Sequence, residues 1–498
     1  MGSSPVETLW LDQDPIRRVV MALPHNKTKI VCTIGPASES QEVMCRLLEA
    51  GMNIARLNFS HGDFSTHKKI IDSLRAASAR TGSRLTIMAD LSGPKMRIGK
   101  IDPEPVDLKP GDAFTLTTDE IVGNSTRVSV SFEGLPKAVK TGDTLYLNDG
   151  YIQLEVAKVQ GNDVMCTVKV GGELRSRKGL NLPNIDLGIS AFTRRDHECL
   201  KFALENGVDA VSQSFVESAK DIHEVRKAAQ DLGYQPFVIA KIERSNALVN
   251  IDEIIDAADG IMIARGDLGV EIPIEKIAVV QKDIMRRANM KAKPVITATQ
   301  MLESMTTNKR PTRAEATDVS NAIINGTDCV MLSGESAMGN YPVESVEMLA
   351  KIAVAVEPER LQISVKEMFR GIDLTEKIRP EHLIAGSVEA SLEFVTPAAV
   401  FVPTRTGATA RSIGRFRLPV WIIAVSSQEA TCQNLQFSYG VFPVLEKDHP
   451  ENWKPYVKEW LQRQEIPGDI VVLTEGPSKK HPDANHRMEI IDLRPPEK

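Results

Sequence analysis

Eight short apolar runs, separated by amphipathic segments, constrain the fold of this chain more than any other feature of its sequence. Apolar residues recur at helical spacing after several of these runs, as near 41–50 and 194–205. The runs lie at 29–33, 53–58, 85–90, 209–214, 237–240, 260–264, 294–297 and 329–332. Strands that alternate with helices build a parallel sheet, and eight such units predict a (β/α)8 TIM barrel, an α/β fold.

Two further patterns interrupt and follow this alternation. Residues 95–186 are rich in Val, Thr, Gly and Asp and contain turn signals such as Asn148-Asp149-Gly150, which predict an inserted all-β domain able to act as a lid. Beyond residue 343, a long helical stretch and five strand-like runs predict a C-terminal α/β domain. We therefore expect an N-terminal extension (1–25), a barrel in two parts (26–94 and 187–342), the lid domain (95–186) and a C-terminal regulatory or assembly domain (343–498).

Composition and missing motifs exclude several classes of protein. A net formal charge of −6 argues against a nucleic-acid-binding protein with a basic surface. No run approaches the roughly 18 apolar residues of a membrane span, and the first 25 residues lack the apolar core of a secretory signal. The six cysteines form no CxxC pair, which favours buried free thiols in the cytoplasm. P-loop, Rossmann, protein-kinase and GxSxG motifs are also missing from the sequence.

Polar side chains follow seven of the eight predicted strands, where a buried strand end needs none. They are Thr33, Arg56, Asn58, Asp90, Lys241, Glu243, Arg265, Asp267, Thr299, Ser333 and Glu335. The carboxyl ends of barrel strands share one rim, where active sites are built. Helix capping alone would explain one or two of these residues, such as Ser333, and any single one could be a solvated strand end.

The strand ends at 241–243 and 265–267 indicate the chemistry. Alternation along a strand places Lys241 and Glu243 on one face, and Glu243 with Asp267 offers two oxygen donors suited to Mg²⁺. Cations beside a metal ion suit a phosphorylated substrate that forms an enolate. A metal-dependent aldolase or lyase would share this carboxylate pair, and a binding protein without activity remains a further alternative.

Six long motifs give the chain its resemblance to a known family. They are ARLNFSHG from Ala55, AKIERSNAL from Ala240, IARGDLGVEIP from Ile263, TATQMLESM from Thr297, RPTRAEATDVSNAI from Arg310 and MLSGESAMGNYP from Met331. These motifs resemble pyruvate kinase, and the resemblance extends over the chain from Lys29 onward. It implies phosphoryl transfer from phosphoenolpyruvate to ADP, giving pyruvate and ATP in the last step of glycolysis. It also implies a cytoplasmic homotetramer, with no membrane or nucleic-acid partner and with a possible anionic allosteric effector.

The resemblance also implies a role for each matching residue. Lys241 would stabilise the enolate, and Arg56 would contact the phosphoryl oxygens. Glu243 and Asp267 would hold Mg²⁺ or Mn²⁺, while the Gly266 and Asp267 N–H groups and the Thr299 hydroxyl would bind the substrate carboxylate. Thr299, Ser333 and Glu335 would lie near the proton path to the enolate carbon. Asn58, His61, Arg97 and Lys178 would form the nucleotide site, and Asp149 would approach from the lid.

Two positions depart from the pattern of most family members. Lys95 stands where most members have Glu, close to the region that holds a monovalent cation in those members (Asn58, Ser60, Asp90 and Leu91). This substitution predicts that the lysine replaces the ion and that K⁺ is not required. Near the C-terminus, the glycine-rich effector loop of some relatives is not evident in the segment from Glu475 to His486, although Lys479 and Lys480 could still contact an anion. Another candidate for an effector phosphate is the turn made by Thr404, Arg405, Thr406, Gly407 and Thr409, for which a well-capped helix is the alternative.

Overall fold

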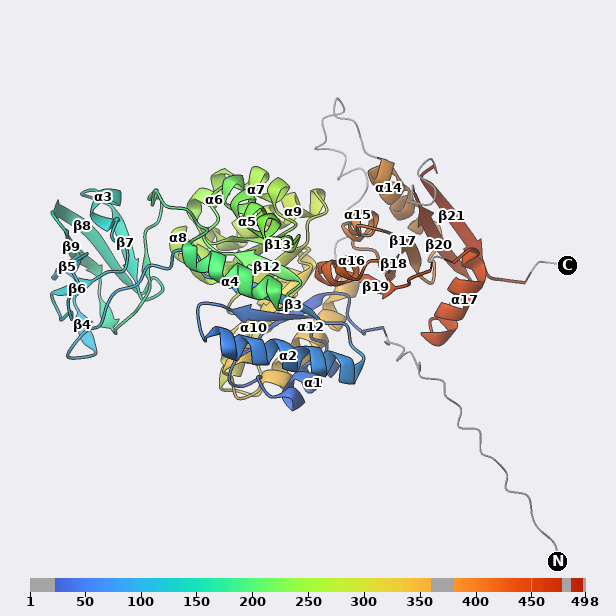
Figure 1. The fold of residues 1–498 in the computed structure, drawn as a ribbon, viewed down its shortest axis with the longest axis horizontal. Helices are drawn as coiled ribbons and strands as arrows, with labels where there is room; N and C mark the ends of the chain where they lie inside the picture. The colour runs from blue at the N-terminus through green and yellow to red at the C-terminus, as the bar shows by residue number, and fades with distance from the viewer. Residues whose placement is uncertain (1–22, 360–379, 449, 477–484, 496–498) are drawn as a thin grey trace, which may run out of the picture.

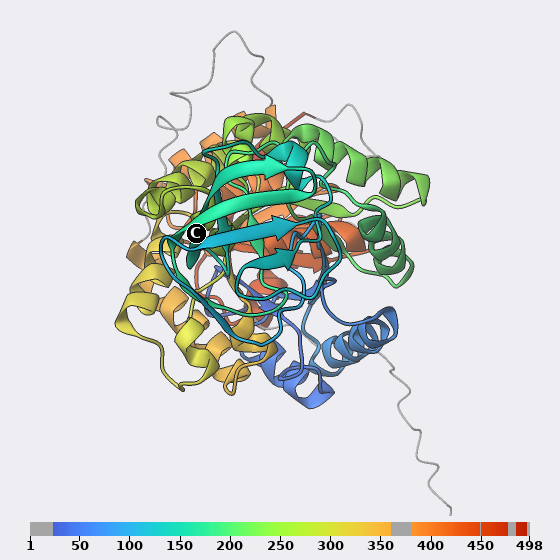
Figure 2. The same cartoon turned by 90° about the vertical axis from the view of Figure 1, so that its left-hand side faces the viewer.

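The computed structural model describes residues 23–359, 380–448, 450–476 and 485–495. Three bodies follow one another along the long axis of the molecule (Figure 1). The inserted β domain lies at the left of that view, the barrel in the centre and the C-terminal domain at the right. Turned by 90°, the molecule shows the inserted domain in front of the barrel (Figure 2). The possible anion-binding lysines Lys479 and Lys480 lie outside the described residues.

The barrel is closed by eight parallel strands that pair in chain order, which confirms the predicted fold class. Their ends differ from the predicted runs by at most two residues. The strands are β1 (Lys29–Thr33), β2 (Ile54–Asn58), β3 (Thr86–Leu91), β12 (Ala210–Gln213), β13 (Phe237–Ile242), β14 (Gly260–Ala264), β15 (Val295–Ala298) and β16 (Cys329–Leu332). Nearly all of their residues are buried, because helices cover the outer face of the barrel and side chains fill its interior.

The barrel helices follow the strands with apolar stripes turned inward. They are α1 (Gln41–Glu49), α2 (Phe64–Thr81), α4 (Arg194–Glu205), α5 (Ala219–Asp231), α7 (Ile251–Ala257), α9 (Ile277–Met290), α10 (Arg313–Ile324) and α12 (Pro342–Val356). The sequence placed the stretch of α12 in the C-terminal domain, and this assignment needs correction. Val343, Val346, Leu349 and Ala353 of α12 belong to the barrel core, because the last strand also needs a helix to cover it.

Short helices stand directly after three of the strands, at the rim. They are α6 (Ser245–Val249), α8 (Arg265–Glu271) and α11 (Gly334–Ala337). Each begins within three residues of the end of its strand, so its first N–H groups lie at the rim. The rim therefore combines polar strand ends with helix N-termini, which favours the binding of anions.

The inserted domain is built almost entirely of strands. A six-stranded sheet has the order β11-β7-β8-β9-β5-β6, and β10 pairs with β4 beside it. The strands are β4 (Val106–Leu108), β5 (Ala113–Thr117), β6 (Arg127–Ser129), β7 (Thr144–Leu147), β8 (Ile152–Gln160), β9 (Asp163–Val170), β10 (Gly172–Leu174) and β11 (Leu180–Asn181). A single helical turn, α3 (Leu135–Ala138), interrupts them, and the domain has its own apolar core.

The C-terminal domain contains the five predicted strands in one sheet of order β19-β18-β17-β20-β21. The strands are β17 (Val400–Pro403), β18 (Ile422–Ser426), β19 (Val441–Leu445), β20 (Ile470–Glu475) and β21 (Arg487–Asp492), of which β21 is antiparallel to β20. Helices α14 (Pro380–Leu392), α15 (Ala408–Gly414), α16 (Glu429–Asn434) and α17 (Trp453–Arg463) pack against this sheet.

The C-terminal domain docks on the end of the barrel where the strands begin. The buried Arg417 donates to both carboxylate oxygens of Asp328, at 2.5 and 2.8 Å, directly before β16. At the start of β1, Lys29 Nζ donates to the carbonyl oxygen of Val441 at 2.8 Å. This docking covers one end of the barrel and leaves the opposite rim to the inserted domain.

The fold also tests two expectations about the chain as a whole. All six cysteines are free and buried, as predicted. Among the described residues, no helix is long and apolar enough to cross a membrane.

Candidate active site

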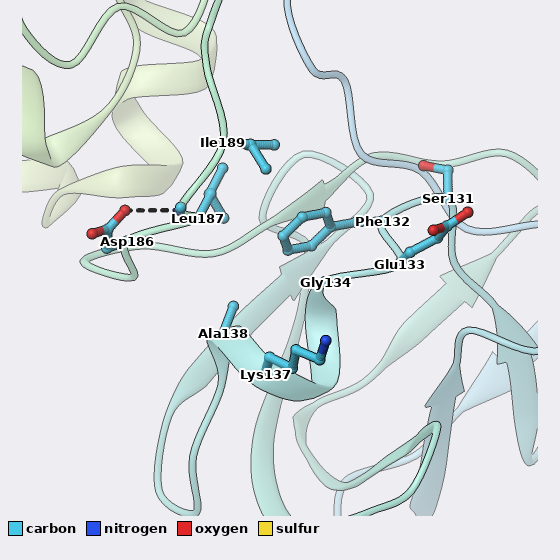
Figure 3. A pocket seen from close by; sticks show the side chains of 10 residues that line it. Ser131, Phe132, Glu133, Gly134, Lys137, Ala138, Asp186, Leu187 and Ile189 are labelled. Atoms are coloured by element: carbon cyan, nitrogen blue, oxygen red, sulfur yellow. Dashed lines mark hydrogen bonds between the residues drawn. The ribbon is translucent and has the colours of Figure 1, made fainter.

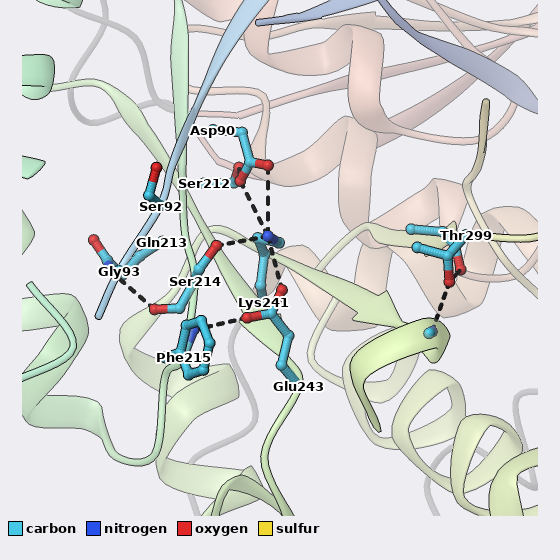
Figure 4. A network of polar contacts seen from close by, with 12 residues as sticks. Asp90, Ser92, Gly93, Ser212, Gln213, Ser214, Phe215, Lys241, Glu243 and Thr299 are labelled. Carbon is cyan, nitrogen blue, oxygen red and sulfur yellow. Dashed lines mark hydrogen bonds and ion pairs between the residues drawn. The ribbon is translucent and has the colours of Figure 1, made fainter. Parts of the chain in front are cut away.

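Lys241 lies at the centre of a buried polar network on the rim where the barrel strands end (Figure 4). Its Nζ is 2.6 Å from Oγ of Ser214, 2.7 Å from Oε1 of Glu243 and 3.3 Å from Oδ1 of Asp90. Burial alone would lower the pKa of Lys241, but the negative charges of Asp90 and Glu243 raise that pKa above its ordinary value. The group therefore stays an ammonium that can stabilise an anion at the rim.

Asp90, in β3, orients a second cation. Arg56 of β2 donates Nε and Nη2 to Oδ2 of Asp90 at 2.9 and 2.5 Å, and donates Nη1 to Oγ1 of Thr33 at 2.8 Å. Ser212 of β12 donates to the other oxygen of Asp90 at 2.7 Å. Burial would raise the pKa of Asp90, yet the charges of Arg56 and Lys241 hold it well below its usual range. The ionised carboxylate thus holds two cations side by side.

Glu243 and Asp267 bring two negative charges close together. Glu243 is almost fully buried, and its Oε2 accepts a hydrogen bond from the Phe215 N–H at 2.9 Å. The Asp267 carboxylate faces water and makes no hydrogen bond or ion pair with the residues that the structure describes. Protein nevertheless surrounds Asp267 closely enough that desolvation, followed by the charge of Glu243, raises its pKa to about 6. A cation held between the two carboxylates would relieve this repulsion.

These donors fit a hard divalent cation. Within the described part of the chain, no group of three or more His, Cys, Asp or Glu side chains could hold a metal ion. Mg²⁺ is commonly bound by one or two protein carboxylates, with water and substrate oxygens completing its octahedron. Glu243 and Asp267 match that pattern, whereas a closed structural zinc site would need four protein ligands.

Thr299 and Gly266 meet at the rim between β15 and α8. Oγ1 of Thr299 accepts a hydrogen bond from the Gly266 N–H at 2.8 Å and donates to the Ala298 carbonyl at 2.7 Å (Figure 4). Thr299 and Gln300 both have positive φ, 67° and 52°, which is a strained conformation for residues with a side chain. The hydroxyl and the first N–H groups of α8, expected to bind a carboxylate together, therefore lie next to each other.

Arg265 and Glu335 hold the Thr299 loop from behind. Nη2 of Arg265 donates to the Thr299 carbonyl at 2.8 Å. Glu335 is fully buried and accepts hydrogen bonds from the N–H groups of Leu302, at 3.0 Å, and Ser333, at 2.7 Å. Among the described residues, these hydrogen bonds of Glu335 are both to backbone N–H groups, so Glu335 positions the loop.

Lys95 lies within electrostatic reach of the network, although the residue is exposed to solvent. Its pKa is lowered by the surrounding protein and by the charge of Lys241, while Asp90, Glu243 and Asp267 act in the opposite direction. Among the described residues, Lys95 has no hydrogen-bond or ion-pair partner for its side chain.

Hydrogen bonds connect some of the residues that are expected around a monovalent cation. Oδ1 of Asn58 accepts from the Ser60 N–H at 3.1 Å, and the hydroxyl oxygens of Ser60 and Ser92 are 2.8 Å apart. Leu91 ends β3 directly before Ser92. The sequence did not single out Ser92, whose hydroxyl engages one of the expected cation ligands.

A basic cluster connects the barrel to the inserted domain. Burial, followed by the charges of Lys95, Arg97 and Arg56, lowers the pKa of His61 below its ordinary value. The Arg97 backbone pairs with Gly179, directly after Lys178, so the two residues expected to bind the nucleotide lie on neighbouring segments. These residues come from two domains, and cationic side chains of this kind can bind phosphate groups.

The fourth strand contributes side chains that the sequence analysis missed. Ser212 and Ser214 bind Asp90 and Lys241, and the N–H of Phe215 binds Glu243. The detectable signal was a pair of hydroxyls at alternate positions in a buried strand, Ser212-Gln213-Ser214. Phe215 also has a positive φ of 60°, which is seen only in the folded backbone.

A separate cavity lies on the inserted domain, away from this network (Figure 3). It has a volume of about 650 Å³ and lies between the segment around α3 and the segment that returns to the barrel. Its lining residues include Phe132, Lys137, Asp186 and Ile189. None of the predicted site residues lines this cavity, so its size does not identify it as the active site.

The hydroxyl groups of the predicted effector turn accept hydrogen bonds from N–H groups of the same turn. Oγ1 of Thr404 accepts from the Gly407 N–H at 3.0 Å, and Oγ1 of Thr406 accepts from the Ala408 N–H at 3.4 Å. Gly407 has a φ of +79° and precedes α15. These contacts favour the capped-helix alternative, while Arg405 remains exposed at the turn.

Comparison with known proteins agrees with this geometry. Family models match residues 25–346 as "Pyruvate kinase, barrel domain" and residues 381–491 as "Pyruvate kinase, alpha/beta domain". The chain belongs to the pyruvate kinase family. It is an enzyme that transfers a phosphoryl group from phosphoenolpyruvate to ADP, giving pyruvate and ATP, and the aldolase, lyase and non-enzymatic alternatives are set aside.

Relatives named pyruvate kinase match along most of their length. The protein from Thermococcus litoralis is 51% identical, over 85% of this chain and 89% of its own. The protein from Thermotoga maritima is 39% identical, over 90% of this chain and 96% of its own. A crystal structure of a pyruvate kinase from Cryptosporidium parvum superposes with a TM-score of 0.87 at 34% identity, covering 94% of this chain and 97% of that one. The three-body architecture is thus that of the family.

Proposed function

We propose that Lys241, Arg56 and Thr299 carry the phosphoryl transfer of this pyruvate kinase. The observation that supports the assignment most directly is the ammonium of Lys241, which is buried, charged and held by three acceptors at the rim. Phosphoryl transfer needs positioning and neutralisation of charge more than covalent chemistry by the protein. Lys241 stabilises the charge that grows on the enolate oxygen, and Arg56 neutralises phosphoryl oxygens from the adjacent strand.

The carboxylate of the substrate binds where α8 begins. The Gly266 and Asp267 N–H groups and the Thr299 hydroxyl form this site, and the substrate carboxylate replaces the contact between Thr299 and Gly266. Ser333, with Glu335 behind it, orients groups on the path of the proton to the enolate carbon. The buried contacts of Glu335 hold that path in place.

Glu243 and Asp267 hold the divalent cation, Mg²⁺ or Mn²⁺. The raised pKa of Asp267 and the proximity of Glu243 support a site that a cation stabilises. When bound, the cation neutralises charge on the substrate oxygens. Asn58, His61, Arg97 and Lys178 bind the nucleotide, and Asp149 approaches from the lid.

The monovalent cation is replaced by Lys95. Its ammonium lies within electrostatic reach of Asp90, Glu243 and Asp267, where a fixed positive charge serves as K⁺ serves in relatives with Glu at this position. Activity is therefore independent of K⁺, although Asn58, Ser60, Asp90 and Leu91 remain in place around the region.

Assembly and regulation follow from the family. The enzyme is a cytoplasmic homotetramer that acts on small-molecule substrates. An anionic effector, where one acts, binds at Thr404–Thr409 near Arg405. The exposed Arg405 supports that position, and phosphate or sugar phosphates titrated against activity would test it. Apart from the placement of α12, the domain boundaries stated above are retained.

A coupled assay with phosphoenolpyruvate and ADP tests the site assignments. Wild-type enzyme should form pyruvate only when Mg²⁺ or Mn²⁺ is present. The same assay on Lys241→Met and on Lys282→Met, an exposed lysine of α9, separates loss of the site from loss of charge. Equal turnover of the two variants would contradict the proposal.

A further inference from the structure

A contact between the inserted domain and the barrel lies next to the site. The turn between β7 and β8 places Gly150 against Val270, near the end of α8. A Cβ atom added to Gly150 would lie 3.3 and 3.4 Å from the two methyl carbons of Val270 and 3.8 Å from its Cβ. The contact therefore joins the tip of the lid to the helix whose first turn carries Asp267.

The backbone of this turn is specialised for the contact. Asn148, Asp149 and Gly150 have consecutive φ values of 53°, 56° and 89°, all in the left-handed region. Two of the three have side chains that make this conformation costly, so the surrounding structure must hold it. Glycine at position 150 keeps the third residue small, and the turn can approach Val270 closely.

The same turn carries Asp149 toward the helix that holds Asp267. Gly150, the residue after Asp149, packs against Val270, and Val270 lies three residues after Asp267 in α8. Asp149 itself is exposed and Val270 is half-buried, and Gly150 provides a close approach of the turn to α8. This contact is apolar, and no ion pair of Asp149 is found among the described residues.

We propose that Gly150 and Val270 form a latch that sets the closed position of the lid, which makes both of them positioning residues for Asp149. This inference rests on the proposed site, because it gives the latch the role of bringing Asp149 to Asp267. Lid closure commonly completes an active site and excludes water. The latch places that control in one small contact near the end of α8, three residues after Asp267.

The chain offers a matched control. Gly142 has a φ of +94°, close to the +89° of Gly150, and a Cβ added there would meet nothing within 4 Å. Gly142→Ala and Gly150→Ala therefore impose the same backbone strain in the same domain. Only Gly150→Ala also presses against Val270, so the difference between the two variants reports the latch.

A double-mutant cycle tests the contact itself. Val270→Ala removes the two methyl groups and leaves the Cβ at 3.8 Å, an ordinary contact distance. Gly150→Ala should raise the KM for ADP by about threefold to tenfold more than Gly142→Ala, and adding Val270→Ala should bring it back to the level of Gly142→Ala. Thermal stability should fall equally in the two glycine variants. Failure of Val270→Ala to rescue Gly150→Ala would overturn the proposal.

A measurement without catalysis separates the latch from the assigned activity. The native cysteines are all buried, so labels can be attached to Ala157→Cys in the lid and Lys282→Cys on α9, both exposed positions. The distance between these labels should become longer or more widely distributed in Val270→Ala, and it should be unchanged in Gly142→Ala. Identical distances in wild type and Val270→Ala would refute the latch even if the enzyme is fully active. If the label distance changes in Val270→Ala but the wild-type protein is inactive in the coupled assay, the latch is supported and the proposed function of the site is refuted.

Discussion

The ammonium of Lys241 lies 2.7 Å from the carboxylate of Glu243, two residues further along the same strand end. Lys241, which is proposed to stabilise negative charge, and Glu243, a proposed metal ligand, are thus in direct contact because residues two apart in a β-strand lie on the same face. Ser214 and Asp90 bind the same ammonium from two other strands. The arrangement lets each charge be tested separately, because each comes from a different position in the chain.

Replacing Lys241 by Met should abolish most of the turnover and leave the fold intact. The neutral side chain has a similar length, but the charge that develops in the transition state loses its nearest cation, so kcat should fall by at least about 10³-fold. The KM for phosphoenolpyruvate should change much less. Steady-state kinetics and circular dichroism check both points, and near-wild-type turnover in a folded variant would refute the role of Lys241.

Glu243→Gln and Asp267→Asn should each weaken the binding of the divalent metal. Both substitutions keep the size of the side chain and remove a charged oxygen ligand, so the Mg²⁺ concentration for half-maximal activity should rise by about tenfold or more. Glu275→Gln, on an exposed segment after α8, serves as the control. An unchanged Mg²⁺ midpoint in both site variants would show that other residues bind the metal.

The activity should not require K⁺, because Lys95 supplies a fixed positive charge near Asp90. Wild-type activity in tetramethylammonium chloride should be close to that in KCl at equal ionic strength, which must be matched because salt screens phosphate-binding cations. Lys95→Glu should lose activity without K⁺ and recover part of it when K⁺ is added.

Lys100→Glu controls for the change of charge, since Lys100 is an exposed lysine a few residues further along the chain. It should respond to K⁺ as the wild type does. A wild type that is inactive without K⁺ would contradict the role given to Lys95.

Lys29 should make stability depend on pH at the junction of the barrel and the C-terminal domain. Burial lowers the pKa of Lys29 to about 8, partly offset by Cys329, Glu357 and Asp328. The folded state therefore binds fewer protons than the unfolded state between about pH 8 and the ordinary lysine value near 10.5, so this group contributes more stability as pH rises through that window.

The measurement is the difference in Tm between wild type and Lys29→Met. This difference should shift in favour of the wild type between pH 7.5 and pH 10, because the methionine variant lacks the titrating group while other effects of pH are shared. The same difference at both pH values would contradict the lowered pKa of Lys29.

The sequence by itself determined the fold class and most of the candidate site. Short apolar runs, alternating with segments of helical spacing, predicted eight barrel strands, and polar residues at strand ends predicted the rim, because these signals are local. Lys241 and Glu243 could be paired from the sequence for the same reason, since they lie two residues apart on one strand.

Only the tertiary structure decided which residues of distant strands form hydrogen bonds and ion pairs with one another. Ser214 meets Lys241, Ser212 meets Asp90 and the N–H of Phe215 meets Glu243 through barrel closure, which no spacing along the chain encodes. The assignment of α12 to the barrel was likewise a matter of packing. An amphipathic helix shows which of its faces is buried, but the partner of that face exists only in the folded molecule.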